Sequence, residues 1–355
     1  MAKVLLTSSR NAGTTINQSA TTFYSPINGT QTAGTTEGNR QMTINQAGVA
    51  SNLYIRILTN TIITDSTFKS RKNGADGNMT VTITALTTGE FEDTTNTDSI
   101  AVGDEYNFQI TGGAGGTSAS FMVMSFVFSA TTGTVAILGD AVGTNVTFAS
   151  TTRYASFMGL ATATTTEANA QYQFNNPCIL KNMYLQSVTN ARTTDTTWRS
   201  RKNTANGNQI ITVAAGATGV YEDTSNTDTI AVNDLFNFSV TTGAGTETLL
   251  RGVMKIESLS TDNSFNMGGN SSGTALTTAG GTLYLALGFF ASALTEGNTE
   301  TDITTEANFA FRVKNLAVYC SVTGGTSATV DFRVNQASSL LSVSVSGTGW
   351  TENTT

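Results

Sequence analysis

Oxygen-bearing side chains cluster at two places in this chain, with the same residue types in the same order. The two clusters consist of Glu92, Asp93, Asn96 and Asp98, and of Glu222, Asp223, Asn226 and Asp228. Carboxylate and amide oxygens are the ligands of Ca²⁺, which takes about six to eight of them. The spacing lacks the Asp-x-Asp-x-Asp-Gly pattern of dedicated calcium loops, and Asp, Thr and Asn also cap backbone N–H groups in ordinary acidic turns. We therefore favour a structural acidic turn, keep Ca²⁺ as the alternative, and expect no other cofactor.

Catalysis is the second chemistry to consider. The chain has no histidine, which excludes Ser-His-Asp triads, Cys-His pairs and histidine zinc sites. Glycoside hydrolysis needs only two carboxylates, about 5 to 9.5 Å apart. Because the same acids recur in both clusters, duplication of a structural turn is more economical than duplication of a catalytic pair. We predict no catalytic residues and no enzyme activity.

Aromatic side chains at related positions are the remaining candidates for a binding site. They are Phe68, Phe91, Trp198, Tyr221 and Trp350. If exposed, such rings could stack on the sugars of a host surface glycan. If buried, they belong to the core, which is the interpretation we favour. Trp198, Tyr221 and Trp350 are kept as candidate surface residues for a ligand.

The charge balance argues against nucleic acid and membrane partners. With 18 basic and 25 acidic residues the net charge is −7, so no basic field attracts nucleic acid or anionic lipid. Short basic clusters at 69–72 and 199–202 are typical of a solvated strand face. The N-terminus turns polar at Thr7, too early for a signal-peptide core of roughly 7 to 15 residues. The apolar stretches at 121–128 and 283–294 are shorter than the ~20 residues of a membrane helix.

The elements that must position these side chains belong to a repeated unit. Residues 64–115 align with 194–245 without a gap, with 30 identities in 52 positions. A diverged third copy is indicated by Tyr284, which follows Tyr154 at the same interval, and by Lys314-Asn315-Leu316, which matches Lys181-Asn182-Met183. The period predicts domains at 1–130, 131–260 and 261–355, hereafter repeats 1, 2 and 3. The third is partial, about 35 residues shorter than the others.

The stretch that repeat 3 lacks corresponds to residues 226–260 of repeat 2, which contain two expected core strands at 234–240 and 249–256. A sandwich without two core strands exposes apolar surface and unpaired sheet edges. Two explanations remain open. The sequence is a fragment of a longer chain, which we favour, or the strands come from another chain by β-strand addition.

Composition and pattern predict an all-β fold. The chain has 67 threonines, and threonine favours the pleated surface of a sheet. In repeat 2, alternation and turn residues predict eight strands. They lie at 154–160, 170–174, 179–188, 196–201, 209–214, 229–232, 235–241 and 249–257. About eight short strands in about 130 residues predict a jelly-roll-like β-sandwich in each repeat.

Two turn motifs carry a family resemblance. Repeat 1 contains Arg71-Lys72-Asn73-Gly74 and Val102-Gly103-Asp104, and repeat 2 replaces the two glycines with Thr204 and Asn233. With the order of the strands, these motifs resemble the C1q/tumour-necrosis-factor-like jelly roll. The threonine-rich tandem organisation also resembles bacteriophage virion proteins such as fibres and capsid decoration proteins. This resemblance implies self-association as a trimer, or three copies that close a pseudo-threefold within one chain.

We therefore expect a non-enzymatic structural protein of a virus-like particle, either a bacteriophage capsid decoration protein or a tail or head fibre. Its expected partners are copies of itself, other virion structural proteins and a host surface glycan. Its expected location is the virion, assembled in the host cytoplasm and exposed on the particle surface. The alternatives are a carbohydrate-binding adhesin that recognises a receptor, and a subunit of a bacterial extracellular filament.

Overall fold

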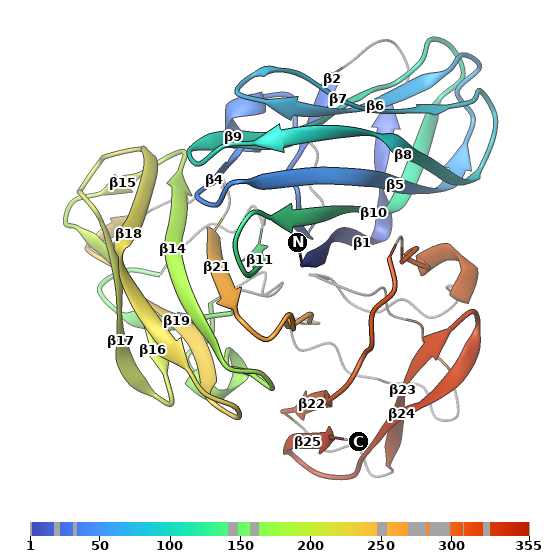
Figure 1. Ribbon diagram of the computed structural model, residues 1–355. Helices are drawn as coiled ribbons and strands as arrows, with labels where there is room; N and C mark the ends of the chain where they lie inside the picture. The colour runs from blue at the N-terminus through green and yellow to red at the C-terminus, as the bar shows by residue number, and fades with distance from the viewer. Residues whose placement is uncertain are drawn as a thin grey trace. The chain divides into compact units, whose positions relative to one another are not determined.

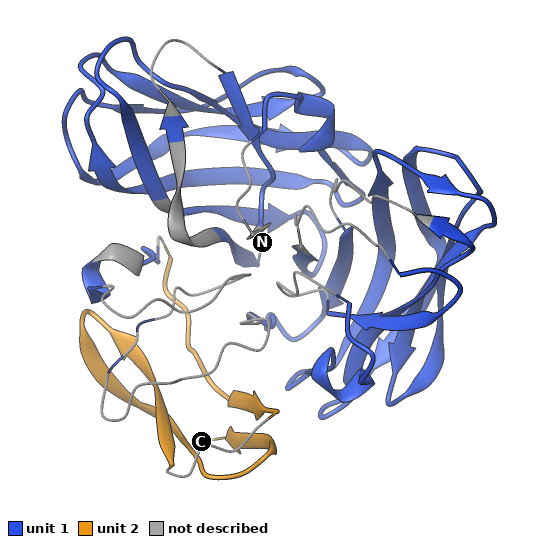
Figure 2. Cartoon of the chain, turned by 180° about the vertical axis from the view of Figure 1, so that it is seen from behind, with its two compact units in different colours: residues 1–308 blue, residues 309–355 orange. Residues whose placement is uncertain are grey.

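A computed structural model describes residues 2–17, 22–30, 34–140, 148–156, 163–246, 254–268, 282, 284, 299–307, 309–321 and 327–354. Within these ranges the chain forms 25 β-strands and three short 3-10 helices (Figure 1). This confirms the predicted all-β class. The chain divides into two compact units, residues 1–308 and 309–355 (Figure 2).

Repeat 1 folds into two facing sheets. The first sheet has the order β3-β1-β10-β5-β8 and is antiparallel except for a parallel contact between β1 and β3. Its strands are β1 (Lys3–Asn17), β3 (Gly29–Thr30), β5 (Gly48–Asn60), β8 (Gly89–Ile100) and β10 (Ser118–Ala130). The second sheet has the order β2-β9-β6-β7, with β4 also paired to β9. Its strands are β2 (Thr22–Ser25), β4 (Met42–Ile44), β6 (Ser66–Lys72), β7 (Ala75–Ile83) and β9 (Asp104–Thr111).

Aromatic rings fill the space between the two sheets of repeat 1. Phe68 on β6 lies edge-on to Phe121 on β10, with ring centroids 5.1 Å apart. Phe108 on β9 meets Phe126 on β10 at 5.5 Å. All four side chains are fully buried. The sheets therefore form a sandwich with an aromatic core.

Repeat 2 adopts the same strand order. One sheet has the order β11-β21-β14-β18, and the other has β12-β19-β16-β17 with β13 paired to β19. The strands of the first are β11 (Thr134–Asp140), β14 (Cys178–Ser187), β18 (Gly219–Ile230) and β21 (Met254–Ser260). Those of the second are β12 (Thr152–Ala155), β13 (Tyr172–Gln173), β16 (Thr196–Lys202), β17 (Ala205–Val213) and β19 (Leu235–Thr241). A short pair, β15 (Ala191–Arg192) and β20 (Gly245–Thr246), lies beside them.

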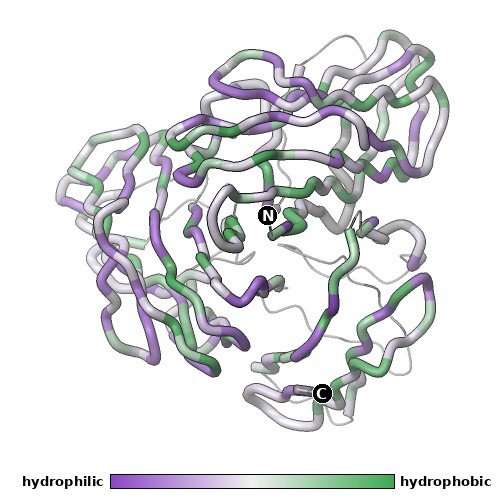
Figure 3. The backbone as a smooth tube through the Cα atoms, viewed as in Figure 1, coloured by the Kyte–Doolittle hydropathy of each residue, from purple (hydrophilic) through white to green (hydrophobic). Residues whose placement is uncertain are grey.

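The strands form where the sequence alternates between apolar and polar residues (Figure 3). In β17, for example, buried and exposed residues alternate along most of the strand. The hairpin between β6 and β7 turns at Asn73 and Gly74, whose φ angles are 52° and 75°. Two consecutive positive φ angles are the requirement of a tight hairpin turn, and Asn-Gly meets it best. The equivalent turn of repeat 2 places Thr204 at φ 66°, so a β-branched residue occupies a left-handed position there.

The unit at 309–355 contains two antiparallel strand pairs. They are β22 (Leu316–Cys320) with β25 (Gly349–Asn353), and β23 (Ala328–Val334) with β24 (Ala337–Val345). Their registers correspond to those of β14 with β18 and of β16 with β17 in repeat 2. Leu341, Val343 and Val345 on β24 are buried. The division into three repeats, with a partial third repeat at 261–355, stays a prediction.

The ends of the strands agree with the predicted period, since β10 ends at Ala130 and β21 ends at Ser260. The predicted position of the acidic clusters was wrong. Expected in turns, they lie inside the long strands β8 and β18. Asp and Asn are rare in regular strands, and they occur here because both strands contain a bulge. Of the predicted strands, 157–160 and 249–253 lie outside the described residues.

Candidate functional site

The acidic cluster of repeat 1 forms a bulge in β8. Asp93 pairs with Leu53 on β5, and the next paired residue of β8, Thr97, lies opposite Ser51 of β5. Residues 94–96 of β8 therefore have no partner in the ladder. A bulge leaves backbone groups unpaired and bends the strand. Side chains of the cluster itself satisfy these groups.

Asp93 is the centre of the bulge. Its carboxylate accepts hydrogen bonds from the backbone N–H groups of Thr80 at 2.8 Å, Thr95 at 3.1 Å and Asn96 at 3.0 Å. The Asn96 side-chain amide also donates to it, at 2.9 Å. Burial raises the pKa of Asp93, but the N–H donors of Asn96 and Thr80 outweigh burial and hold the pKa at about 2. Asp93 is therefore a charged, buried acceptor that stabilises the bulge.

Asp98 lies at the other end of the cluster and connects β8 to two strands of the opposite sheet, β7 and β9. It accepts the backbone N–H of Asn78 on β7 at 2.6 Å and the hydroxyl of Tyr106 on β9 at 2.7 Å. A Cβ on Gly77 would lie 2.7 Å from one Asp98 oxygen, so this close approach requires glycine. Asp98 is buried, and its role is to join the two sheets.

Repeat 2 reproduces this arrangement. Asp223 accepts the backbone N–H groups of Ile210 at 2.8 Å and Asn226 at 3.0 Å. Burial raises the pKa of Asp223, but hydrogen bonds from the Asn226 side chain and from backbone N–H groups outweigh burial and hold the pKa below its usual range. Asp228 accepts the N–H of Asn208 at 2.7 Å. The duplicated acids thus have duplicated structural roles.

The two glutamates of the clusters point to different partners. A hydrogen bond with Glu306 raises the pKa of Glu92 to about 7, and burial and charge repulsion add to the effect. The equivalent Glu222 accepts the side-chain amide of Asn45 at 3.3 Å. Among the described residues, no three acidic, histidine or cysteine side chains are arranged to hold a metal. The aspartates are committed to N–H donors, so the geometry supports a structural role for the clusters, in bulged strands rather than in turns. Calcium binding stays a prediction.

Trp198 is a core residue, and its assignment as a surface residue for a ligand was wrong. It is 5% exposed, and Phe68 at the equivalent place in repeat 1 is fully buried. Trp198 lies on β16, whose alternate residues face the interior of the sandwich. Its indole N–H is buried, and no acceptor for it lies within the described part of the chain. A ring in this place cannot stack on a sugar.

The other candidate aromatics are half-buried. Phe91 and Tyr221 occupy equivalent places on β8 and β18 and pack against the core. Trp350 on β25 lies across from Tyr319 on β22, with ring centroids 5.4 Å apart. These rings retain exposed surface, so Tyr221 and Trp350 stay candidates for ligand contact.

The basic clusters are not simply solvated. Arg71 forms an ion pair with Glu37 at 2.8 Å and a second with Asp76, and its side chain is 12% exposed. In repeat 2, Arg201 pairs with Glu167 at 2.8 Å. Hydrogen bonding to Glu37 raises the pKa of Arg71. Each arginine ties a short 3-10 helix, η1 (Glu37–Asn39) or η2 (Glu167–Asn169), to the neighbouring hairpin.

The most buried charges of the described chain lie where repeat 2 meets repeat 1, and they are not among the residues predicted from the sequence. Lys255 and Glu257 on β21 are both 0% exposed, and their charged groups lie 3.0 Å apart. Lys255 also donates to the backbone carbonyl of Thr43. Glu257 accepts the backbone N–H of Asn45 at 2.9 Å and the side-chain amide of Asn182 at 2.6 Å. This network joins residues that are 212 positions apart in the chain.

A signal for this network was present in the sequence. The positions that correspond to Lys255 and Glu257 in repeat 1 are Ser125 and Val127. Two charged residues, two positions apart, thus replace uncharged residues on one face of a core strand. Such a pair is buried only when it is matched by a partner, and here the partner is the segment 43–45 of repeat 1.

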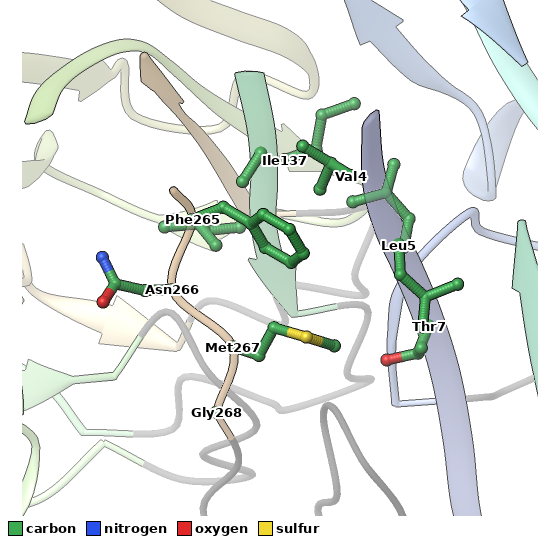
Figure 4. A pocket seen from close by; sticks show the side chains of 11 residues that line it. Val4, Leu5, Thr7, Ile137, Phe265, Asn266, Met267 and Gly268 are labelled. Atoms are coloured by element: carbon green, nitrogen blue, oxygen red, sulfur yellow. The ribbon is translucent and has the colours of Figure 1, made fainter. Parts of the chain in front are cut away.

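The pocket shown in Figure 4 is small and apolar. It lies between β1, β11 and residues 265–268, and Val4, Ile137, Phe265 and Met267 contribute its apolar side chains. Its volume is ≈ 10 Å³, which is room for about one water molecule. This pocket therefore does not provide a small-molecule site.

Comparison with known proteins adds no assignment. No family model matches the chain, and no curated protein matches it significantly. Within the described residues, no helix is both long enough and apolar enough to span a bilayer.

Proposed function

We propose that the protein is a structural component of a virus-like particle, either a bacteriophage capsid decoration protein or a tail or head fibre. The observation that carries this proposal is that its buried charged and polar groups stabilise strands and join one repeat to the next. Asp93, Asp98 and Glu257 all accept hydrogen bonds from the protein's own N–H groups. A chain organised in this way is suited to forming a rigid surface.

Head-to-tail contact between repeats supports self-association within one chain. Tyr184 of repeat 2 donates to the backbone carbonyl of Gln41 in repeat 1 at 3.5 Å. The equivalent Tyr54 of repeat 1 donates to the carbonyl of Thr304, in the predicted third repeat, at 3.4 Å. The same face of two repeats thus receives a segment of a different repeat, as in a heterologous contact. This favours the pseudo-threefold alternative over a trimer of chains.

The experiment that tests the proposal is fractionation of the native source by density gradient, with mass spectrometry of each fraction and electron microscopy of the particles. The chain should be found in particles that contain nucleic acid. Its presence only in filaments free of nucleic acid would overturn the proposal in favour of a filament subunit. Sedimentation of the purified chain distinguishes the assembly models, since the single-chain model requires a monomer.

A carbohydrate-binding adhesin is the second candidate, and the half-exposed Trp350–Tyr319 ring pair is the observation that favours it. A glycan array with the wild-type chain and with Trp350→Ala and Tyr221→Ala tests this function. Binding that either substitution abolishes would support the adhesin. Trp198 is buried, so Trp198→Phe is the matched control and should leave any binding unchanged.

A further inference from the structure

Three buried side chains at the contact between repeats 1 and 2 have the chemistry of an amide-forming site. They are the amine of Lys255, the carboxylate of Glu257 and the amide of Asn182, which are 0%, 0% and 7% exposed. One Glu257 oxygen lies 3.0 Å from the Lys255 nitrogen, and the other lies 2.6 Å from the Asn182 nitrogen. A single carboxylate therefore bridges a nucleophile and an electrophilic amide.

The fold brings these groups together from adjacent strands. Lys255 and Glu257 are two residues apart on β21 and so lie on the same face. Asn182 lies in a bulge of β14, where the pairing between the two strands skips from Lys181 to Tyr184. Its φ angle is 54°, a left-handed conformation that asparagine tolerates better than most residues. Bulges commonly redirect a side chain, and here the Asn182 amide is directed to Glu257.

Repeat 1 covers the site and excludes water from it. The carbonyl of Thr43 accepts from Lys255, and the N–H of Asn45 donates to Glu257. The ring of Tyr184 lies 5.6 Å from the Lys255 nitrogen. In such a dry site, transfer of a proton from the amine to the carboxylate removes two buried charges. The transfer also leaves the amine as a neutral nucleophile.

We infer that Lys255 and Asn182 form an intramolecular isopeptide bond, with Glu257 as the catalytic residue. Glu257 takes a proton from the Lys255 ammonium, and the neutral Nζ attacks Cγ of Asn182. Glu257 passes that proton to Nδ2 and takes a second proton from Nζ, so the new Cγ–Nζ bond becomes an amide as the Cγ–Nδ2 bond breaks. One molecule of ammonia leaves for each bond formed, and nothing is oxidised or reduced. The product covalently links β14 to β21.

Repeat 1 is an internal control, because it retains the asparagine but not the other two groups. The positions equivalent to Asn182, Lys255 and Glu257 are Asn52, Ser125 and Val127. Asn52 lies in the same bulge with a φ angle of 55°, so its backbone is matched. The bond is therefore expected in repeat 2 and not in repeat 1. This inference does not depend on the proposed function.

The test is mass spectrometry of the denatured chain and of its tryptic digest. The chain should be lighter than its sequence mass by one ammonia, about 17 Da. Trypsin should release residues 182–192 joined to residues 252–312, because the acylated Lys255 is no longer cleaved. Residues 41–56, which contain Asn52, should appear unlinked. Release of free 182–192 and free 252–255, with no joined species, overturns the inference.

Three further results keep the test specific. Cyclisation of Asn182 to a succinimide also loses ammonia but leaves Lys255 cleavable, so that pattern overturns the inference. Glu257→Gln should abolish the joined peptide, and a joined peptide in this variant would overturn the catalytic role of Glu257. Lys255→Met, which keeps an unbranched side chain as far as Cε and lacks the amine, should show the full sequence mass. All three chains are compared under denaturing conditions, so the comparison does not require equal stability.

Discussion

Substitution of Asp93 is the sharpest test of the structural role assigned to the acidic clusters. Asp93 is 5% exposed and accepts three backbone N–H groups from two strands. Asp93→Asn keeps an acceptor oxygen and removes the charge, whereas Asp93→Ala leaves all three N–H groups without their acceptor. The two variants therefore separate the contribution of the charge from that of the hydrogen bonds.

The pKa of Asp93 sets the expected magnitude. A fall from 3.8 to about 2 corresponds to roughly 2 kcal/mol of stability at neutral pH. We expect this loss for Asp93→Asn. For Asp93→Ala we expect about 3 kcal/mol, because a buried donor left unpaired costs about 1 to 3 kcal/mol and solvent can reach part of the bulge. Glu90→Gln, at a side chain that is 47% exposed, is the control and should cost less than about 1 kcal/mol.

The assay is urea unfolding followed by circular dichroism between pH 2 and pH 7, with and without Ca²⁺. The folded pKa of Asp93 lies below its unfolded value, so its contribution is complete above about pH 4 and is lost as the pH falls through about 2. The difference between wild type and Asp93→Asn should therefore vanish at low pH. A difference in unfolding free energy between wild type and Asp93→Asn that does not depend on pH would refute the structural role. A loss of stability in Asp93→Ala as small as that of an ordinary surface substitution, about 0.5 kcal/mol, would also refute it. Stabilisation of the wild type by Ca²⁺ that Asp93→Ala abolishes would establish the calcium alternative instead.

Three further predictions follow from single positions. The hydrogen bond with Glu306 raises the pKa of Glu92 from 4.5 to about 7. This contact should therefore stabilise the fold below about pH 4.5 and weaken as the pH rises through 7. Glu306→Gln should remove this pH dependence of stability in a series of thermal melts. Thr204→Gly should stabilise repeat 2 by about 1 kcal/mol in urea unfolding, because it relieves a left-handed φ of 66°. Gly74→Thr should destabilise repeat 1 by a similar amount in the same assay. Variants as stable as the wild type would contradict the claim that Thr204 is strained. Trp198→Phe should cost about 1 to 2 kcal/mol through lost core volume, and a variant as stable as wild type would show that the indole is not packed as described.

Much of the fold was predictable because its signals are local. The alternation in β17 and the turn at Asn73 and Gly74 are properties of neighbouring residues. The acidic clusters were misread as loops because Asp93 and Asn96 resemble turn residues in sequence. Their bulge exists only because β5 supplies a partner on each side of the extra residues. Trp198 was ambiguous for a similar reason, since alternation assigns it to a face but does not say which face is covered.

The sequence by itself determined the repeat, the all-β class and most strands of each sandwich, since duplication copied both the apolar alternation and the turn residues that produce them. Only the tertiary structure decided which faces of the repeats meet. Lys255 and Glu257 read as part of an ordinary core strand until Thr43 and Asn45, 212 residues away, are placed against them. The physical reason is that a strand's pattern reports which residues share a face, whereas the partner that covers that face is chosen by contacts distant in sequence.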